Sequence, residues 1–370
     1  MRGLYRLIVR IFAVVLISTA MLLSFLTITE YRPDDLETVE VVNNVTPSVK
    51  LNEPLRFMTF NIGYAGLGAT EDFVMDGGEK GRPDSLNVVE SFLAGILNVM
   101  TEEQAIDFYL MQEVDLNARR SYYVNQVERI QERLGDSYSS VFALNFKATF
   151  VPFPVSLTDY IGPVESGLQT LSRFDVNEAE RHQFPGSFSW PLRIANLKRA
   201  MLVTTYEIED SERVLIVVNL HMSAYDDGGM RSQEMAYLRE FIQSEYDNGN
   251  YVVVGGDFNH LFPNTTEVFP LDEILKGYWN VEEMENNYFG EDFVLGFDPT
   301  LPTCRLLHQP FVPSDPNFMY DPNDPETQFY VIDGFLVSKN VQIELVYTVD
   351  QGFEYSDHNP VVIEVILLED

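Results

Sequence analysis

The chain has 370 residues with 45% apolar and 13% aromatic content, a single cysteine and a formal net charge of −33. This composition is typical of a folded globular protein, and it excludes both a disordered chain and a fold held by intrachain disulfides. The negative charge disfavours proteins that track duplex nucleic acid, because those need many Lys and Arg contacts to phosphates.

The first predicted element is an apolar segment at residues 11–28, which contains no charged residue. As a helix it spans about 27 Å, close to the ~30 Å hydrocarbon core of a membrane. Arg2, Arg6 and Arg10 precede it, and positive residues stay on the cytoplasmic side. A cleaved signal peptide is the alternative, but its apolar region usually has only about 7–15 residues. We therefore expect an uncleaved, single-pass anchor in the cell membrane at residues 1–30, with the rest of the chain extracytoplasmic.

Residues 31–54 are polar, acidic and aperiodic, which predicts a linker to one domain at 55–370. Apolar segments bounded by turn residues predict strands at 55–62, 106–111, 139–146, 167–174, 199–207, 213–220, 251–254, 329–337, 341–349 and 361–368. Helical spacing of apolar residues predicts helices at 85–100, 123–134 and 232–246. Glycine or proline content predicts loops at 70–83, 147–166 and 263–325, the second of them over the functional site.

The segment YVVVGGDFNH at 251–260 is the most informative in the chain. Three consecutive valines indicate a buried strand, and Gly255 and Gly256 let the backbone bend where that strand ends. Asp257 and Asn259 are two positions apart, so in an extended segment their side chains point the same way. This pair suits the binding of a water or a phosphate oxygen, although a strand-end turn with an Asx cap explains it equally well.

Other predicted strands also end in a polar residue. These residues are Asn61, Glu113, His221, Asp257, Asn259, Asp333, Asp357 and His358. Together they indicate one rim that holds a metal-assisted phosphate site. Because they are distributed from position 61 to position 358, the two ends of the domain must meet at this rim, which favours one domain over two.

The motifs FNIG, MQEVD, GLQTLSRF, VNLH, GGDFN, IDGF and SDHNP occur in this order, each close to a strand end. In this arrangement the chain resembles the endonuclease/exonuclease/phosphatase superfamily, and the resemblance covers about residues 55–368. It implies an α/β (α+β) fold: a four-layer αββα sandwich of two mostly antiparallel sheets with helices outside. The superfamily includes deoxyribonucleases, apurinic endonucleases, inositol polyphosphate phosphatases and neutral sphingomyelinases.

The resemblance also implies a metal site for Mg²⁺, with Mn²⁺ or Ca²⁺ as alternatives. Glu113 is similar to the principal metal-binding carboxylate of the family. Asn61 would lie beside the metal and the phosphate, and Asp357 would lie near the metal. In this chain Ile62 and Gly63 follow Asn61, so the second acidic ligand that apurinic endonucleases have at that point is missing. This departure disfavours a role in the repair of abasic sites.

The catalytic residues implied by the resemblance lie at the other strand ends. Asp257 would orient or deprotonate the attacking water, and Asn259 would hold the phosphate. His221 and His358 would flank the phosphorus, and Asp333 would fix the tautomer of His358.

Basic and polar residues near these motifs are candidates for substrate binding. We include Arg120, Arg173 and His260 in this group, although a plain surface position explains Arg120, and a loop position explains His260, equally well. Residues 193–199 hold the densest basic cluster of an acidic chain, formed by Arg193, Lys198 and Arg199. The cluster either attracts an anionic head group or pairs with nearby acidic residues.

We expect a metal-dependent hydrolase of phosphodiester bonds that acts as a monomer attached to the membrane. The substrate remains open at this point between nucleic acid, a phospholipid head group as in sphingomyelinases, and a small molecule. The alternative of another class is a surface binding protein that has kept the fold without turnover.

Overall fold

The computed structural model describes residues 2–103, 105–225, 229–311 and 327–369. Two seven-stranded sheets form the domain. The first has the order β15 (Val341–Thr348), β16 (Val361–Leu367), β3 (Pro54–Asn61), β4 (Phe108–Asp115), β6 (Gly162–Ser172), β5 (Ser139–Val151), β2 (Val41–Val42). The second has the order β1 (Leu36–Thr38), β7 (Glu178–Gln183), β8 (Ala200–Glu207), β9 (Val214–His221), β10 (Tyr251–Asp257), β14 (Asp333–Ser338), β11 (Phe293–Gly296). A separate pair joins β12 (Cys304–Arg305) to β13 (Phe329–Tyr330).

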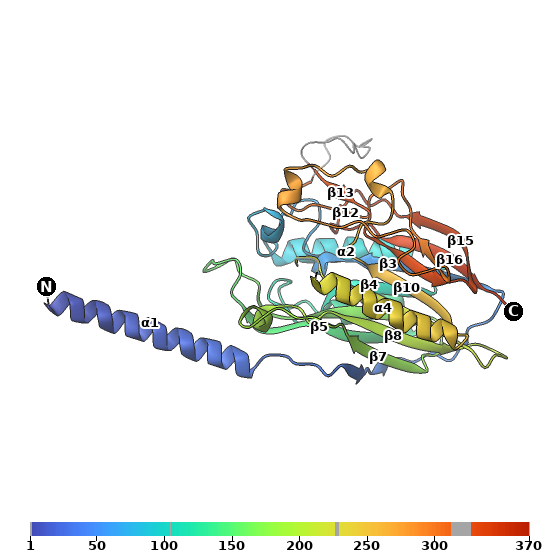
Figure 1. Ribbon diagram of the computed structural model, residues 1–370, viewed down its shortest axis with the longest axis horizontal. Helices are drawn as coiled ribbons and strands as arrows, with labels where there is room; N and C mark the ends of the chain where they lie inside the picture. The colour runs from blue at the N-terminus through green and yellow to red at the C-terminus, as the bar shows by residue number, and fades with distance from the viewer. Residues whose placement is uncertain (1, 104, 226–228, 312–326, 370) are drawn as a thin grey trace.

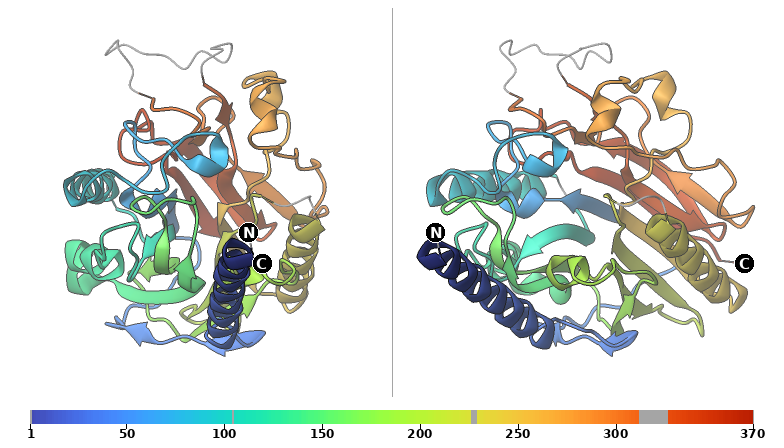
Figure 2. Two further views of the ribbon diagram at one scale, coloured as in Figure 1. Left: turned by 90° about the vertical axis from the view of Figure 1, so that its left-hand side faces the viewer. Right: turned by 60° about the vertical axis from the view of Figure 1, so that its left-hand side comes forward.

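Helices cover the outer face of each sheet. Helices α2 (Leu86–Glu102) and α3 (Gln126–Leu134) lie on the first sheet, and α4 (Gly229–Asp247) lies on the second, which the left view of Figure 2 shows clearly. Three large apolar clusters fill the spaces between these layers. The predicted four-layer αββα sandwich is therefore confirmed.

Alternation along the central strands explains how the layers pack. In β10, Tyr251 and Val253 face the other sheet, whereas Val252 and Val254 face α4. All four side chains are at most 1% exposed. The side chains of a strand point alternately to its two faces, so a strand between two apolar layers must be apolar throughout. Each buried valine stabilises the fold by about 1.5–3 kcal/mol.

Strand direction brings the motif residues to one edge. Strand β3 is parallel to β4, and β9 is parallel to β10, so the carboxyl ends of each pair lie at the same edge. Strands β14 and β16 run antiparallel to their neighbours β10 and β3, so they begin at that edge. The segment before β16, which contains Asp357 and His358, therefore meets the ends of strands that lie far away in the sequence.

A buried polar network joins the two sheets beneath this edge. Gln112 on β4 donates a hydrogen bond of 2.8 Å to the side-chain oxygen of Asn219 on β9. Asn219 in turn donates to the carbonyls of Met111 (3.2 Å) and Gln169 (3.1 Å). Both Gln112 and Asn219 are fully buried. Because buried amides are costly unless they are paired, this network holds the two sheets in one register at the base of the site.

Some expected element boundaries are wrong. Residues 36–49 do not form a free linker: β1 pairs with β7, β2 pairs with β5, and Val49 is fully buried in a bridge to Ile208. The loop expected at 147–166 is shorter, because β5 continues to Val151 and β6 begins at Gly162. Strand β7 was not predicted, and β11 and β12 lie within the segment expected to be mostly loop. Part of that segment, 312–326, lies outside the described residues.

The N-terminal helix α1 (Arg2–Ile28) extends away from the domain (Figure 1). Among the described residues it is the one helix long and apolar enough to cross a membrane, with a mean hydropathy of 2.5 in its most apolar window. Only Leu26 is buried against the domain.

Candidate active site

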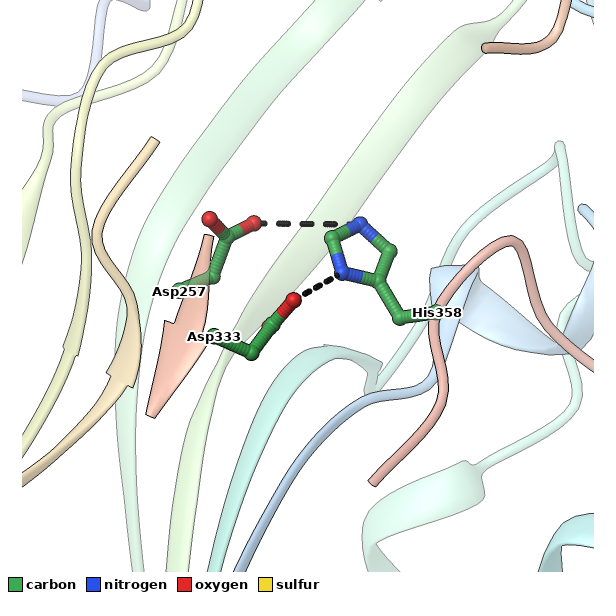
Figure 3. Close-up of side chains that lie close together, drawn as sticks. All are labelled: Asp257, Asp333 and His358. Atoms are coloured by element: carbon green, nitrogen blue, oxygen red, sulfur yellow. Dashed lines mark hydrogen bonds and ion pairs between the residues drawn. The ribbon is translucent and has the colours of Figure 1, made fainter. Parts of the chain in front are cut away.

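The centre of the rim is an aspartate–histidine pair. His358 Nδ1 lies 2.8 Å from Asp333 Oδ2, and both side chains are almost completely buried. Asp257 lies on the other side of the imidazole, with its Oδ2 3.8 Å from His358 Nε2 (Figure 3). Burial alone would lower the pKa of His358, but the charges and the hydrogen bond of its neighbours, Asp333 foremost, together outweigh it and raise this pKa well above 6.5. The pair therefore holds a protonated imidazole.

Asp257 is the acidic centre around which the other groups lie. It is paired in register with His221 of β9 and with Asp333 of β14, so the three residues form one row across adjacent strands. Asp257 Oδ2 accepts a hydrogen bond from Asn61 Nδ2 (3.0 Å) and lies 3.3 Å from His221 Nε2. Burial, and next the charge of Asp333, raises the pKa of Asp257 to about 7.

The two histidines of the rim have opposite charge states. Burial, together with the positive charges of Arg199 and His358, lowers the pKa of His221 well below 6.5. His221 is therefore neutral at pH 7, while His358 is protonated. Titratable groups whose environments separate their pKa values in this way commonly divide acid and base roles between them.

A bulge in β4 aims Glu113 into the site. The register of β4 with β6 shifts between Met111 and Val114, and Glu113 has a φ of 54°, in the left-handed region. Such a backbone costs about 1–3 kcal/mol for a residue other than glycine. The bulge keeps Gln112 in the buried network and leaves the Glu113 side chain 25% exposed. Its carboxylate lies 4.0 Å from His221 Nε2.

Arg120 is held beside Glu113. Its guanidinium donates to both oxygens of the Asp115 carboxylate, at 2.9 and 3.2 Å, and stacks on the ring of Tyr64 at 3.8 Å. Its Nη1 lies 4.0 Å from Glu113 Oε2. Because the bonds to Asp115 and the stacking on Tyr64 fix the guanidinium, Arg120 presents its charge to the cavity from a defined position.

Glu113, Asn61 and Asp357 line the same cavity and offer the oxygen ligands that a hard divalent cation prefers. Burial raises the pKa of Asp357 to about 7 against the opposing charge of His358, and the nearby Glu113 carboxylate adds to the rise. A second cluster is formed by Asp257, Asp333 and His358, whose ligand atoms lie within 4.8 Å of one another. In that cluster the Asp333–His358 hydrogen bond already uses Nδ1, and Mg²⁺ prefers oxygen ligands. The oxygen set therefore fits Mg²⁺ better.

Gly63 explains why the chain turns so tightly beside Asp357. Its φ is +49°, and a Cβ at this position would lie 2.7 Å from Asp357 Oδ1. Its backbone N–H donates to Asn61 Oδ1 at 3.0 Å. A glycine is therefore needed two residues after Asn61, both for the left-handed backbone and for the close approach to the carboxylate.

The cavity at this rim has a volume of about 610 Å³. Its lining includes Asn61, Glu113, Asp257, Asp357 and His358, together with His221, Asn259 and Arg120. The rest of its lining is mainly apolar. The structure thus brings eight of the predicted residues to one cavity, and Asp333 supports them from behind through His358.

Two predicted substrate-binding residues are wrong. Arg173 follows the end of β6, where the register places Ser172 opposite Phe108 at the start of β4, so it lies at the edge opposite the site. There it donates to the Tyr138 hydroxyl at 2.8 Å. His260 turns its Nδ1 back to the carbonyl of Phe258, at 3.0 Å, and does not line the cavity. Neither position can be separated from the motif residues by sequence spacing alone.

Asn259 lies in the cavity wall in a strained conformation. Its φ is 49°, its N–H donates to Asp257 Oδ1 at 2.9 Å, and its Nδ2 donates to the Met222 carbonyl at 2.8 Å. The backbone bond to Asp257 is the Asx turn that we considered from the sequence. It coexists with a place in the cavity wall, so the two interpretations do not exclude each other.

Sequence reasoning missed Arg199, Tyr225 and Asp76, which also line the cavity. Arg199 Nη1 is buried and has no hydrogen-bond partner within the described part of the chain, and burial lowers the pKa of this guanidinium. The Tyr225 hydroxyl donates to the Asp76 carboxylate. Arg199 was visible as one of a basic cluster, but nothing in the sequence separates it from Arg193 and Lys198.

Comparison with solved structures shows which fold class the chain has. It is similar to an endonuclease/exonuclease/phosphatase from Beutenbergia cavernae, with 17% identity, a TM-score of 0.56, and 86% of this chain and 72% of that chain covered. It is also similar to a family protein from Leptotrichia buccalis, with 14% identity, a TM-score of 0.50, and 84% and 99% covered. No family model and no curated protein matches the sequence. The chain has the endonuclease/exonuclease/phosphatase fold, as its motifs predicted.

Proposed function

We propose that this protein hydrolyses phosphodiester bonds with the help of Mg²⁺, for which Mn²⁺ or Ca²⁺ can substitute. The observation that supports this most strongly is the convergence of Asp257, the Asp333–His358 pair and Glu113 on one cavity. A divalent cation held by Glu113, Asp357 and Asn61 would neutralise charge on the phosphate and on the leaving oxygen.

The side chains of the site have the remaining roles in the reaction. Asp257 orients the attacking water and accepts its proton, and its pKa of about 7 suits a base that operates near neutral pH. The protonated imidazole of His358 faces the oxygens on which charge develops, and Asp333 keeps its ring in place. Arg120 and Arg199 supply further positive charge to the anionic substrate, and Asn259 and His221 position the phosphate.

We also propose a placement in the cell. Helix α1 spans the cell membrane once, with Arg2, Arg6 and Arg10 on the cytoplasmic side and the catalytic domain outside. The domain acts as a monomer, because all the side chains of the proposed mechanism come from one chain.

The test is hydrolysis of bis(4-nitrophenyl) phosphate, a soluble aryl phosphodiester, by the full chain in detergent with Mg²⁺. We expect His358→Ala and Asp257→Asn each to lower the rate by about 10²–10⁴, the usual contribution of a positioned acid or base. Thermal unfolding of each variant shows whether the fold is kept. Rates equal to those of the parent in well-folded variants would overturn the proposal.

A further inference from the structure

Part of the lining of the active-site cavity is apolar, and the N-terminal helix contributes to it. Its lining there includes Leu23 and Leu26 of α1, Val151 at the end of β5 with Phe153 after it, and Leu192 and Leu197 before β8. We call these six residues the apolar arm. Five of the six side chains are aliphatic, so the wall offers nothing to the charged backbone of a nucleic-acid strand, whereas a hydrocarbon chain is stabilised by every apolar contact that it makes there.

Ion pairs hold the end of α1 against the segment that contains Leu192 and Leu197 of the apolar arm. The carboxylate of Glu30, whose side chain is only 2% exposed, lies 3.2 Å from both Arg193 Nε and Lys198 Nζ, and it also pairs with Arg32 at 2.9 Å. Burial alone would raise the pKa of Glu30, but hydrogen bonds from Arg32 and Lys198 outweigh it and lower the pKa. Two members of the basic cluster therefore hold the helix to the domain, and only Arg199 faces the cavity.

A second contact fixes the same junction. Trp190 Nε1 donates a hydrogen bond of 3.1 Å to Thr27 Oγ1, in the last turn of α1. The segment around Trp190 leads into Leu192 of the arm, so the helix end, the indole and the arm form one continuous surface. Trp side chains are enriched where a membrane meets water, because their rings are apolar and their N–H is polar.

Exposed apolar side chains occur at this junction and elsewhere on the same side of the domain (Figure 1). Val155 and Leu157 are each 97% exposed, Leu192 is 61% exposed and Trp190 is 52% exposed. Val155 and Leu157 lie in the loop between β5 and β6, which projects from the domain on the side from which α1 leaves it (Figure 1). Exposed apolar residues that lie beside a membrane-spanning helix fit the interfacial layer of the same membrane.

We propose that the substrate is a phospholipid of the membrane leaflet from which the domain emerges. Its phosphodiester head group reaches the rim of Asp257 and His358, and its hydrocarbon part lies along the apolar arm. This inference rests on the proposed function, and it adds the substrate class and the route of entry. In the reaction, the water oxygen forms a bond to phosphorus and one ester P–O bond breaks. The proton of the water goes to Asp257, which later releases it to solvent, and the leaving oxygen takes a proton from solvent water, so the products are an alcohol and a phosphomonoester.

The test compares a lipid with a soluble substrate on the same enzyme. The full chain is reconstituted in vesicles of phosphatidylcholine, phosphatidylglycerol or sphingomyelin, and its lipid hydrolysis is measured beside that of bis(4-nitrophenyl) phosphate. The variant carries Val155→Asp and Leu157→Asp, which change only exposed side chains. We expect it to lose about tenfold or more of its lipid turnover, because two charged residues disfavour insertion into the interface, while the soluble diester is cleaved as before.

Two further variants control the comparison. Leu345→Asp changes a residue that is 46% exposed on β15, away from α1 (Figure 1), and should leave both rates unchanged. Ala195→Phe adds a ring to the lining of the cavity near the arm and should lower lipid turnover selectively.

The outcomes separate this inference from the function on which it rests. Cleavage of the soluble diester without cleavage of any lipid would overturn the inference and leave the proposed function intact. Equal losses on both substrates in the Val155 and Leu157 variant would also overturn it. If neither substrate is cleaved by the parent, the proposed function fails, and the inference fails with it.

Discussion

The Asp333–His358 pair gives the sharpest test of the site. In Asp333→Asn the side chain keeps its shape, and its amide oxygen can still accept the 2.8 Å hydrogen bond from Nδ1. The bond changes from a charged to a neutral one. Charged hydrogen bonds contribute about 1.5–3 kcal/mol and neutral ones about 0.5–1.5 kcal/mol, so the substitution removes about 1–2 kcal/mol. At 1.36 kcal/mol for each factor of ten, kcat/KM should fall about fivefold to thirtyfold.

The assay has two readouts. Initial rates on bis(4-nitrophenyl) phosphate give kcat/KM, and the ring-proton resonance of His358, followed by NMR against pH, gives its pKa. Because the Asp333 carboxylate is the largest of the influences that raise this pKa, Asp333→Asn should lower it as well as the rate. The control is Asp136→Asn, the same chemical change at an exposed position after α3. It should change neither quantity.

One result would refute the reasoning. The result would be a folded Asp333→Asn variant with an unchanged His358 pKa and a rate within about twofold of the parent. Such a change in rate is well below the effect of a lost charged hydrogen bond, so the pair would have no electrostatic role. His358 would then owe its orientation to packing alone. The assignment of a protonated imidazole to the reaction would have to be abandoned, although the fold and the cavity would stand.

Three further predictions test the metal site, the sheet contact and the pH response. Saturating Mg²⁺, at about 100 times its Kd, should stabilise the folded parent by about 2.7 kcal/mol, and calorimetry should show no such gain in Glu113→Gln; an equal gain in both would place the metal elsewhere. Asn219→Ala removes the hydrogen bond from Gln112 and the bonds to the Met111 and Gln169 carbonyls, so urea unfolding should report a loss of about 1–3 kcal/mol, and no loss would mean that water replaces the amide. Burial lowers the pKa of His182 below 6.5 despite the nearby carboxylate of Glu180, so the unfolded chain binds more protons below pH 6.5 and stability should fall there as the pH drops. His182→Gln should flatten this acid slope in unfolding measured at several pH values, and an unchanged slope would assign the response to other groups.

Much of the fold was predictable because the strands carry their own signals. Val252, Val253 and Val254 indicate a strand buried on both faces, and the structure buries all three completely. The strand ends were predictable for the same reason, since a carboxylate such as Asp257 interrupts an apolar segment only where that segment leaves the core. The sequence did not show which strands pair with one another. Strand β7 has the sequence EAERHQ, which lacks an apolar pattern, and it forms because β1 and β8 lie on either side of it.

The candidate site, too, was predictable in part. The motif residues were found because each follows a strand, and the parallel pairs bring those ends together. Arg199 was missed because its role depends on how β8 begins and on which acidic residues lie near its two basic neighbours. Glu30 pairs with Arg193 and Lys198 across more than 160 positions of sequence, and this contact leaves Arg199 for the cavity. Long-range ion pairs of this kind have no local pattern from which they can be predicted.

The acidic surface and the apolar arm together determine how an anionic substrate can reach the site. A chain with a net charge of −33 repels anions in solution, and this repulsion extends over about 8 Å at physiological salt. A phosphodiester that diffuses freely would have to cross this field before it reached Arg120, Arg199 and His358. A lipid that enters between α1 and the loop of Val155 would instead reach those cations along an uncharged wall. Under the lipid proposal the surface charge excludes soluble polyanions without slowing the substrate, so lipid turnover should depend only weakly on ionic strength. A steep rise of lipid turnover with added salt would show that the substrate crosses the acidic surface after all.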